Sequence, residues 1–355
     1  MKKILFVAGA RPNFIKLSPV LDTVMNFDEL HPIVVHTGQH YDSNMSDIFF
    51  HDLKIPQPDY HFTITSTTHG RQTAEILSSL EELMEEIKPD CVVVIGDVTS
   101  TLAGALAAAK LNIKTAHIEA GLRSFNNEMP EEINRKVADH ISTMLFAPSK
   151  TAMNNLAGEG LASSSFFTGD VMFDAVLRNK EIASASDVLD RLKLIPNEYY
   201  LATLHRPYNV DNMSQLLEII SAFAMLDKPI LFPVHPRTSR QLVKYSVNVS
   251  DNIFFSEPLG YLDFLHLQAY AKKIITDSGG IQKEAYFLKV PCITLRSETE
   301  WIETVESGAN ILVRDRIKDN IIKAVGAECS SEFSDNFFGN GDASKKIIEI
   351  LIKNL

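Results

Sequence analysis

The stretch CVVVIGDVTSTLAGALAAAKLNIKTAHIE, residues 91–119, decides the fold class. Its first part, Cys91–Gly96, is a continuous apolar run of the kind found in parallel strands that are buried on both faces. A helical pattern follows at Thr101–Lys110, and a second apolar run follows at Thr115–Glu119. This order of strand, helix and strand predicts a right-handed βαβ unit within a parallel sheet.

The same alternation of apolar runs and helical patterns continues along the chain. Further strands are expected at Lys3–Ala8, Ile33–Thr37, Met144–Pro148, Tyr200–Leu204, Ile230–Val234, Ile253–Ser256, Ile274–Thr276, Pro291–Leu295 and Asn310–Val313. Further helices are expected at Gly70–Ile87, Pro130–Ile141, Met213–Met225, Gly280–Leu288 and Ala343–Ile352. This repetition predicts an α/β protein with doubly wound parallel sheets.

The chain has 355 residues, which is too long for a single sheet of this kind. A seam is expected near Gly169–Ser186, because a fresh series of strands begins at Tyr200. We therefore expect two Rossmann-like domains, at residues 1–169 and 170–342, with the last helix, within residues 343–355, packed on either half. Ligands bind at the carboxyl ends of strands in open α/β sheets, so two such sheets facing each other would form one cleft between the domains.

Composition narrows the classes of function. The chain has 34 Lys and Arg against 45 Asp and Glu, a net charge of −11, which argues against nucleic acid or an anionic membrane as the main partner. No apolar run reaches the ~18 residues of a membrane span. The first run stops at Arg11 and Pro12, which favours a strand over a signal peptide. The three cysteines lie far apart without metal-ligand spacing, which favours a reducing cytoplasm and no metal site.

A glycine turn in the second half is a candidate anion site. Ser278, Gly279 and Gly280 follow a predicted strand and open a predicted helix, where free backbone amides would bind a phosphate. Glu284, one helical turn further on, is placed to accept hydrogen bonds from ribose hydroxyls. The alternative interpretation is a helix capped by Asp277 or Ser278, with the glycines present for tight packing.

Cations follow several of the predicted strands. Arg11 and Lys16 flank the start of a helix that begins with proline, where an arginine opposes the helix dipole and calls for an anionic partner. His205 and Arg206 end one strand of the second half, and His235 ends the next, close before Arg237. These side chains could clamp a diphosphate. The alternatives are solvated cations at a loop and histidines satisfied within the core.

Acidic side chains end the predicted strands of the first half. Asp97 and Glu119 close two neighbouring strands, and Glu131 and Glu132 begin a helix. The alternatives are a helix cap for Asp97 and, for the two glutamates, compensation of the helix dipole and pairing with the cations one turn later. Three acids around one substrate carbon would raise at least one pKa by mutual repulsion, as general acid–base catalysis requires.

Two features connect the halves. The turn at Gly96–Ser100 and the turn at Thr276–Gly280 are weakly similar, since each places an aspartate between a strand and a helix. The first half offers carboxylates, whereas the second offers an anion seat and cations. This division suits a nucleotide-linked sugar whose reacting carbon lies between the two.

At this level of detail the sequence resembles a known family, the non-hydrolysing UDP-N-acetylglucosamine 2-epimerases. The motifs that carry the resemblance occur in family order and are GARPNFIK (9–16), HTGQH (36–40), GDVTST (96–101), HIEAGLR (117–123), MPEEINR (129–135), HPR (235–237) and TDSGGIQKEA (276–285). The resemblance implies a two-domain GT-B fold, a homodimer and no nicotinamide cofactor. It also implies a cytoplasmic enzyme that makes precursors of surface polysaccharides.

The resemblance further implies a mechanism. A base removes the proton from C2 of the sugar, and UDP leaves C1 by anti elimination to give a 2-acetamidoglucal. The glycal is then protonated on its other face, and UDP adds back. The implied catalytic residues are Asp97, Glu119, Glu131 and His205. The implied substrate contacts are Arg11, Lys16, Arg123, Arg206, His235, Ser278, Gly279, Gly280 and Glu284.

Several positions depart from the family pattern. Asn13 stands where members often have glutamate, which would alter contacts with the sugar. Gln39, Arg71 and His235 match a possible allosteric UDP-GlcNAc site, but Asp42 stands where that site has glutamine.

Other segments resemble a sister branch that epimerises UDP-2,3-diacetamido-2,3-dideoxyglucuronic acid at C2. They are the short segment 124–129, QKEAYF (282–287) and TEWIE (299–303). A GT-B glycosyltransferase, which would need an acceptor, and a nucleotide-sugar sensor are further alternatives.

Overall fold

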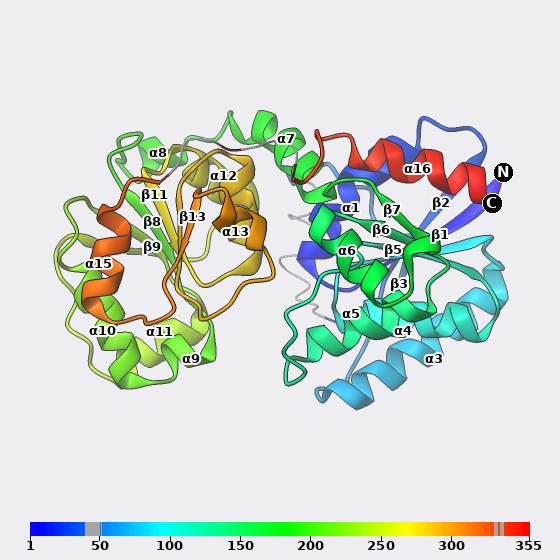
Figure 1. Ribbon diagram of the computed structural model, residues 1–355, viewed down its shortest axis with the longest axis horizontal. Coiled ribbons are helices and arrows are strands. Elements are labelled where there is room, and N and C mark those ends of the chain that lie inside the picture. The colour runs from blue at the N-terminus through cyan, green and yellow to red at the C-terminus, as the bar shows by residue number, and fades with distance from the viewer. Residues whose placement is uncertain (40–49, 51, 330–332, 334–336) are drawn as a thin grey trace. The chain divides into compact units, whose positions relative to one another are not determined.

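A computed structural model of the chain describes residues 1–39, 50, 52–329, 333 and 337–355 (Figure 1). The chain forms two compact units. Unit 1 comprises Met1–Ala175 and Asp335–Leu355, and unit 2 comprises Val176–Ser334. The division falls within helix α7 (Val171–Ala183), a few residues beyond the boundary expected from sequence. Within the described residues, no helix combines the length and the apolar character needed to cross a bilayer.

Unit 1 contains a seven-stranded parallel sheet with the order β3-β2-β1-β4-β5-β6-β7. Its strands are β1 (Lys2–Ala8), β2 (Leu30–His36), β3 (Tyr60–His61), β4 (Cys91–Ile95), β5 (Lys114–Ile118), β6 (Met144–Ala147) and β7 (Ser165–Phe167). Its other helices are α1 (Arg11–Val24), α3 (His69–Ile87), α4 (Thr99–Lys110), α5 (Pro130–Ile141), α6 (Lys150–Gly158), the 3-10 turn Ala162–Ser164 and α16 (Ala343–Asn354). Among the described strands of this unit, the sequence did not predict the edge strands β3 and β7, which are too short to form an apolar run, and it also did not predict α6.

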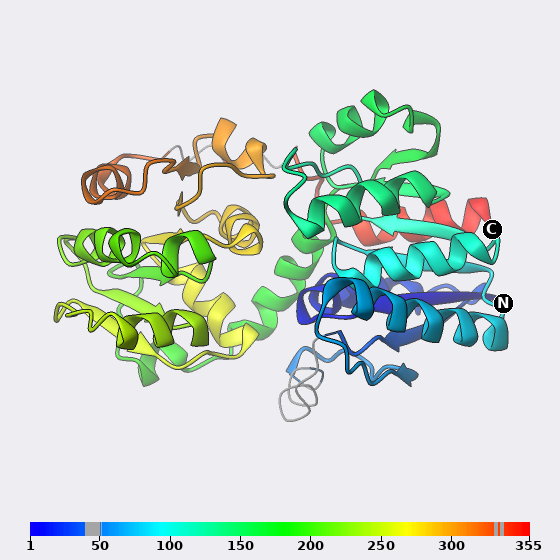
Figure 2. The same cartoon turned by 90° about the horizontal axis from the view of Figure 1, so that it is seen from below.

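Helices cover both faces of the unit 1 sheet. Helices α3, α4 and α5 lie on one face, and α1 and α16 pack together on the other (Figure 1). One core cluster joins β1, β2 and β4 to α3 and α4. Figures 1 and 2 show the two chain ends side by side within this unit, where the Lys114 ammonium donates to the carbonyl of Asn354.

Unit 2 contains a six-stranded parallel sheet with the order β10-β9-β8-β11-β12-β13. Its strands are β8 (Tyr200–Thr203), β9 (Ile230–Pro233), β10 (Ile253–Ser256), β11 (Lys273–Thr276), β12 (Cys292–Thr294) and β13 (Asn310–Leu312). Its other helices are α8 (Val188–Arg191), α9 (Pro207–Val210), α10 (Met213–Phe223), α11 (Pro236–Lys244), α12 (Tyr261–Tyr270), α13 (Gly279–Phe287), α14 (Ile302–Glu306) and α15 (Lys318–Gly326). The prediction of two doubly wound parallel sheets is confirmed.

The strand order reverses at an equivalent point in each unit. The reversal lies between β1 and β4 in unit 1 and between β8 and β11 in unit 2. Loops diverge at such a switch point, which leaves room for a ligand at the carboxyl ends of the two strands. In unit 1 the packing there depends on Gly9, because a Cβ atom would lie only 1.9 Å from the Ser100 hydroxyl oxygen.

Candidate active site

The turn after β1 is fastened by Asn13, whose side chain is almost fully buried. Its Oδ1 atom accepts hydrogen bonds from the amides of Gly9 (3.3 Å) and Ala10 (3.1 Å), and its Nδ2 atom donates to the carbonyl of Ile95 (3.1 Å). An amide can both accept and donate here, whereas a carboxylate could only accept. Asn13 therefore ties α1 to the end of β4, and the expectation of altered sugar contacts stays a prediction.

Glu119 lies directly after β5 in a strained conformation. Its φ is +72°, its side chain is 4% exposed, and its carboxylate forms an ion pair with Lys16. Gly96, whose φ of +69° favours glycine, lies beside this pair, and a Cβ atom there would make ordinary contacts of 3.4 Å with Glu119 Oε2 and 3.6 Å with Lys16 Nζ. Backbone strain of this kind persists only where the surroundings impose it, and it is common at active sites.

Asp97 is bound by an arginine rather than by a helix end. Its Oδ2 atom accepts hydrogen bonds from Arg135 Nη2 (2.6 Å) and Nε (3.0 Å), and its side chain keeps 30% of its surface exposed. The N-cap of α4 is Val98, which has no side-chain capping bond, so the interpretation of Asp97 as a helix cap is wrong. Asp97 is both fixed in orientation and open to solvent.

The two glutamates at the start of α5 differ. Glu132 is buried and accepts hydrogen bonds from the amides of Ser124 (2.8 Å) and Phe125 (3.1 Å) and from Arg135 (3.0 Å). Burial alone would raise the pKa of Glu132, but these hydrogen bonds lower it below its ordinary value. Glu131 is half-buried and forms no hydrogen bond or ion pair with any residue that the structure describes. Pairing with the later cations therefore falls to Glu132 alone.

Arg123 is an internal residue. Its side chain has no exposed surface, and its guanidinium binds Glu159 twice at 2.7 Å and Asp139 at 2.7 Å. Because these two carboxylates already bind its guanidinium, we correct its expected role from substrate contact to scaffold.

The other expected residues of unit 1 divide between exposed and bound side chains. Arg11 is exposed at the start of α1 and has no partner among the described residues, which is compatible with both a solvated cation and a contact to an anionic ligand. Gln39 accepts from the amide (3.0 Å) and hydroxyl (2.7 Å) of Ser100. Arg71 is exposed in the first turn of α3. His40 and Asp42 lie outside the described residues.

In unit 2, Asp277 organises the end of β8. Its buried carboxylate contacts His205 Nδ1 (2.9 Å) and accepts hydrogen bonds from the amides of His205 (3.1 Å) and Arg206 (3.0 Å) and from Asn209 Nδ2 (3.0 Å). Burial alone would raise the pKa of Asp277, but His205 and the other donors lower it. The carboxylate therefore keeps a proton on Nδ1 of His205, whose side chain is 37% exposed, and leaves Nε2 to act on a ligand.

The glycine turn after β11 has a cationic neighbour that sequence reasoning missed. A Cβ atom on Gly279 would lie 2.5 Å from Glu300 Oε1 and 3.5 Å from Arg296 Nη1, so an acidic oxygen and a guanidinium meet at this turn. Arg296 is 3% exposed and pairs with Glu300 at 3.0 Å. Ser278 is the N-cap residue of α13 and Gly279 is tightly packed, as the capping alternative expects, but the Ser278 side chain forms no capping bond and its amide donates to Thr276 Oγ1 at 3.0 Å. The sequence did hold a signal for this cation, because Arg296 follows the apolar strand β12, which lies next to β11 in the sheet.

Three arginines of unit 2 have incomplete hydrogen bonding. Arg206 Nε, Arg296 Nη1 and Arg316 Nε are buried without a hydrogen-bond partner among the described residues. Tyr208 lies among them, with the Arg316 guanidinium 5.1 Å from the centre of its ring. Buried donors are normally paired, so this group of guanidinium N–H groups is suited to an anionic ligand.

Glu284 is positioned by its neighbours in unit 2. Gln268 on α12 donates to Glu284 Oε2 at 2.6 Å, and both side chains are buried. Burial and the adjacent Glu284 carboxylate raise the pKa of Tyr261 well above its ordinary value. On the same helix as Glu284, the Lys283 ammonium lies 3.9 Å from the centre of the Trp301 ring.

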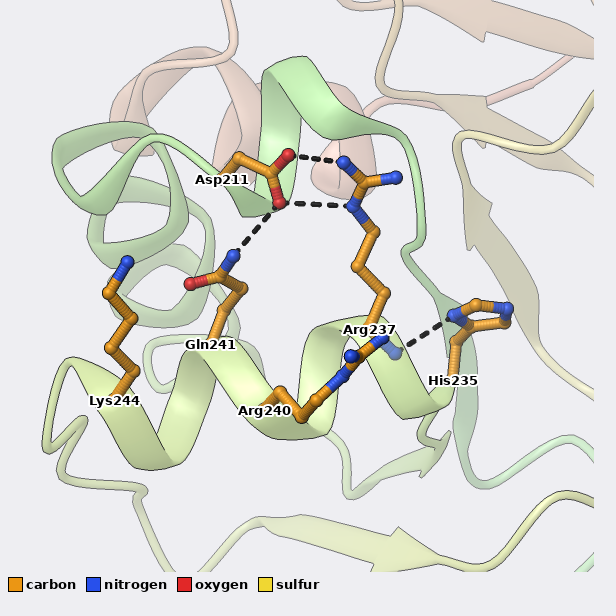
Figure 3. A pocket seen from close by; sticks show the side chains of 6 residues that line it. All are labelled: Asp211, His235, Arg237, Arg240, Gln241 and Lys244. Carbon is orange, nitrogen blue, oxygen red and sulfur yellow. Dashed lines mark hydrogen bonds and ion pairs between the residues drawn. The ribbon is translucent and has the colours of Figure 1, made fainter. Parts of the chain in front are cut away.

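A cavity of about 420 Å³ opens beside α11 within unit 2 (Figure 3). It is lined by Asp211, His235, Arg237, Arg240, Gln241 and Lys244. Arg237 reaches back to pair with Asp211, and the amide of Arg237 donates to His235 Nδ1 at 3.1 Å (Figure 3). Burial and the nearby His205 lower the pKa of His235, so the ring is neutral at pH 7. Arg237, the cation that the HPR motif was expected to offer to a ligand, is therefore already paired with the Asp211 carboxylate.

Comparisons with known proteins agree on the family. A model of the UDP-N-acetylglucosamine 2-epimerase family matches residues 23–352. A Methanococcus maripaludis protein described as a UDP-N-acetylglucosamine 2-epimerase homolog is 50% identical, over 98% of this chain and 99% of its own. The UDP-2,3-diacetamido-2,3-dideoxy-D-glucuronate 2-epimerase of Pseudomonas aeruginosa is 42% identical, over 99% of both chains.

Solved structures extend the comparison to the fold. The UDP-GlcNAc 2-epimerase of Methanocaldococcus jannaschii, solved with UDP-GlcNAc and UDP, is 44% identical and superposes with a TM-score of 0.88 over 99% of both chains. A calicheamicin glycosyltransferase superposes with a TM-score of 0.61 over 99% of both chains, at 13% identity, which concerns the fold alone. The chain has a GT-B-like fold and belongs to the UDP-N-acetylglucosamine 2-epimerase family of isomerases.

Proposed function

We propose that this chain is a non-hydrolysing epimerase that interconverts UDP-GlcNAc and UDP-ManNAc. The observation that carries the proposal is the chemistry at the two switch points. Unit 1 presents carboxylates fixed by cations, and unit 2 presents guanidinium groups with unpartnered N–H donors. The relative from Methanocaldococcus jannaschii, which was solved with UDP-GlcNAc and UDP, supports the same substrate class.

Unit 2 would bind the UDP moiety. The backbone amides of Gly279 and Gly280 at the start of α13 suit a phosphate, whereas the Ser278 amide already donates to Thr276 Oγ1 at 3.0 Å. Arg296 and Arg206 bring unpartnered donors to the same switch point. His205 would stabilise the charge that develops on the leaving diphosphate. Asp277 contacts the Nδ1 atom of His205, which leaves the Nε2 atom for the ligand. Glu284, held by Gln268, would accept hydrogen bonds from the ribose hydroxyls.

Unit 1 would carry out proton transfer at C2. A carboxylate takes the C2 proton, the C–H electrons form the C1–C2 double bond, and the C1–O bond breaks so that its electrons leave with UDP. The reverse steps deliver a proton to the opposite face of C2 and return the UDP oxygen to C1. We assign these transfers to the set Asp97, Glu119 and Glu131. Lys16 would hold Glu119 in place, and Arg135 would hold Asp97.

A second substrate is favoured by a specific observation. The Pseudomonas aeruginosa relative, which is 42% identical, is named for UDP-2,3-diacetamido-2,3-dideoxy-D-glucuronate. The elimination chemistry would be unchanged, and only the contacts at C3 and C6 of the sugar would differ.

The experiment is to incubate the purified chain with each UDP-sugar separately, without acceptor, and to follow the anomeric protons by NMR. We expect a UDP-ManNAc signal from UDP-GlcNAc. Conversion of the diacetamido sugar alone would replace the first proposal by the second. UDP release that requires an added acceptor would instead indicate a glycosyltransferase. Light scattering on the same sample tests the proposed homodimer.

A further inference from the structure

A chain of four alternating charges lies beneath the carboxyl ends of β4 and β5 in unit 1. His117 Nδ1 contacts Asp139 Oδ1 at 2.7 Å, and Asp139 Oδ2 contacts Arg123 at 2.7 Å. Arg123 then binds Glu159 through two hydrogen bonds of 2.7 Å. The first three side chains have no exposed surface, and Glu159 keeps 26% exposed. These four charged side chains therefore connect the interior of unit 1 to its surface.

His117 uses both of its ring nitrogens as donors. Its Nε2 atom lies 2.8 Å from the carbonyl oxygen of Gly96, which can only accept, and its Nδ1 atom faces the Asp139 carboxylate. Burial alone would lower the pKa of His117, but Asp139 raises it. Burial alone would raise the pKa of Asp139, but His117 and Arg123 lower it. The pair is therefore an imidazolium and a carboxylate.

His117 and Asp139 form hydrogen bonds to the backbone of the two turns that carry Asp97 and Glu119. His117 holds the carbonyl of Gly96, the residue before Asp97, and Asp139 Oδ2 accepts from the amide of Gly121 at 3.1 Å, two residues after Glu119. Gly96, Glu119 and Gly121 all have positive φ, at +69°, +72° and +81°. Gly96 and Gly121 adopt such a φ without strain, but Glu119 does not, so its conformation needs support from the surrounding structure. The pair supplies part of that support through its hydrogen bond to the nearby amide of Gly121.

We propose that the His117–Asp139 ion pair positions Asp97 and Glu119 for proton transfer, with Arg123 and Glu159 closing its outer end. The inference rests on the proposed epimerase function. His117 and Asp139 have no exposed surface, so they act through the backbone of the two turns and do not contact substrate. Loss of the pair should therefore reduce turnover without reducing the grip on UDP.

The test compares His117→Asn with His117→Gln. Glutamine can keep the donor to Gly96 near the Nε2 position, whereas asparagine can keep only the donor to Asp139. We expect H117N to lower kcat about 100-fold, with the KM and the Kd for UDP within threefold of wild type, and H117Q to recover about tenfold of that loss. A kcat of H117N within threefold of wild type, per UDP-binding site, would overturn the proposal.

Glu159→Gln is the second variant, because its half-exposed side chain can change without emptying the core. We expect E159Q to fold, to lower kcat about threefold to tenfold and to leave UDP binding unchanged. The matched control is His140→Gln, which alters an exposed ring 3.8 Å from the same Glu159 carboxylate and should leave kcat unchanged. If H117N does not fold, an unchanged kcat in E159Q overturns the proposal.

Two further readouts separate the failure of this inference from the failure of the proposed function. An inactive wild-type protein would refute the function alone. Amide hydrogen exchange at residues 96–97 and 119–121 does not depend on activity, and H117N should accelerate it at least tenfold while exchange in β8 and β11 stays unchanged. Uniform acceleration across both units would indicate general destabilisation and would overturn the positioning role.

Discussion

Asp97 and Asp277 occupy equivalent places in two sheets of the same order, yet they have opposite environments. Each follows the strand beyond the switch point, β4 in unit 1 and β11 in unit 2. Asp97 keeps 30% of its side chain exposed, and among the described residues its carboxylate is bound by Arg135. Asp277 has no exposed surface and organises three residues of the β8 turn. Under the proposed function, the same position would serve chemistry in unit 1, whereas it serves scaffolding in unit 2.

The cations of the two units differ in a complementary way. In unit 1, Lys16 and Arg135 are paired with the carboxylates that they fix. In unit 2, the guanidiniums of Arg206 and Arg296 keep buried N–H groups without a partner among the described residues. Paired charges favour a fixed geometry, whereas unpartnered donors favour capture of an anion. This difference supports the proposal that unit 1 transfers the proton and unit 2 binds the diphosphate.

The largest expected effect is on Asp97. Replacing Asp97 with Asn removes a proton-transfer group and should lower kcat by about 10³-fold, or ~4 kcal/mol in the barrier, with the Kd for UDP within threefold of wild type. Steady-state kinetics and calorimetry with UDP measure the two quantities. Unchanged turnover would remove Asp97 from the catalytic set.

Asp277→Asn should act mainly on stability. In the wild-type protein the buried Asp277 carboxylate accepts from several donors, and an asparagine would place an NH2 group against some of them. The unfolding free energy of unit 2 should therefore fall by about 3 kcal/mol, and the affinity for UDP should fall as well. Denaturant unfolding measures the first and calorimetry the second. The control is Asp263→Asn, whose carboxylate is paired near the surface with the half-exposed Arg191 and should cost at most about 1 kcal/mol. Equal losses in the two variants would contradict the scaffolding role.

Acid should destabilise unit 1 through His36, at the end of β2. Burial and the neighbouring His61 lower the pKa of His36 from 6.5 to about 4. The unfolded chain then binds more protons than the folded one between these values, so the contribution is intact above pH 6.5 and is lost as pH falls toward 4. We expect a loss of about 2 kcal/mol between pH 7.5 and pH 5. In the His36→Asn variant, the unfolding free energy should change less with pH in this window. A variant whose unfolding free energy falls with pH as steeply as that of the wild type would show that His36 is not the group responsible.

The smallest effect sharpens the unit 2 side. Arg296→Gln removes a guanidinium with an unpartnered donor and should weaken UDP binding about 10- to 100-fold, with a smaller change in kcat. The control is Arg191→Gln, which removes a half-exposed guanidinium already paired on the surface of unit 2. Equal UDP affinity in R296Q and wild type would show that the donor at the Gly279 turn does not bind phosphate.

The sequence predicted most of the fold because long apolar runs mark buried parallel strands. It missed β3 and β7, which have two and three residues at the sheet edges. Strand ends also placed Asp97, Glu119 and Ser278 at the carboxyl edges correctly. Ion pairs could not be predicted in this way, because Arg123 pairs with Asp139 and with Glu159, which lies 36 residues further along the chain.

The proposed mechanism is tested most directly by whether the proton at C2 of the sugar exchanges with solvent. Purified wild-type protein is incubated with UDP-GlcNAc in D2O, and both epimers are isolated and analysed by mass spectrometry and NMR. Removal and return of the proton through solvent-exchangeable carboxyl groups predicts one deuterium at C2 of the UDP-ManNAc product. A product that retains full protium at C2 would contradict deprotonation, and with it the role assigned to the carboxylates of unit 1.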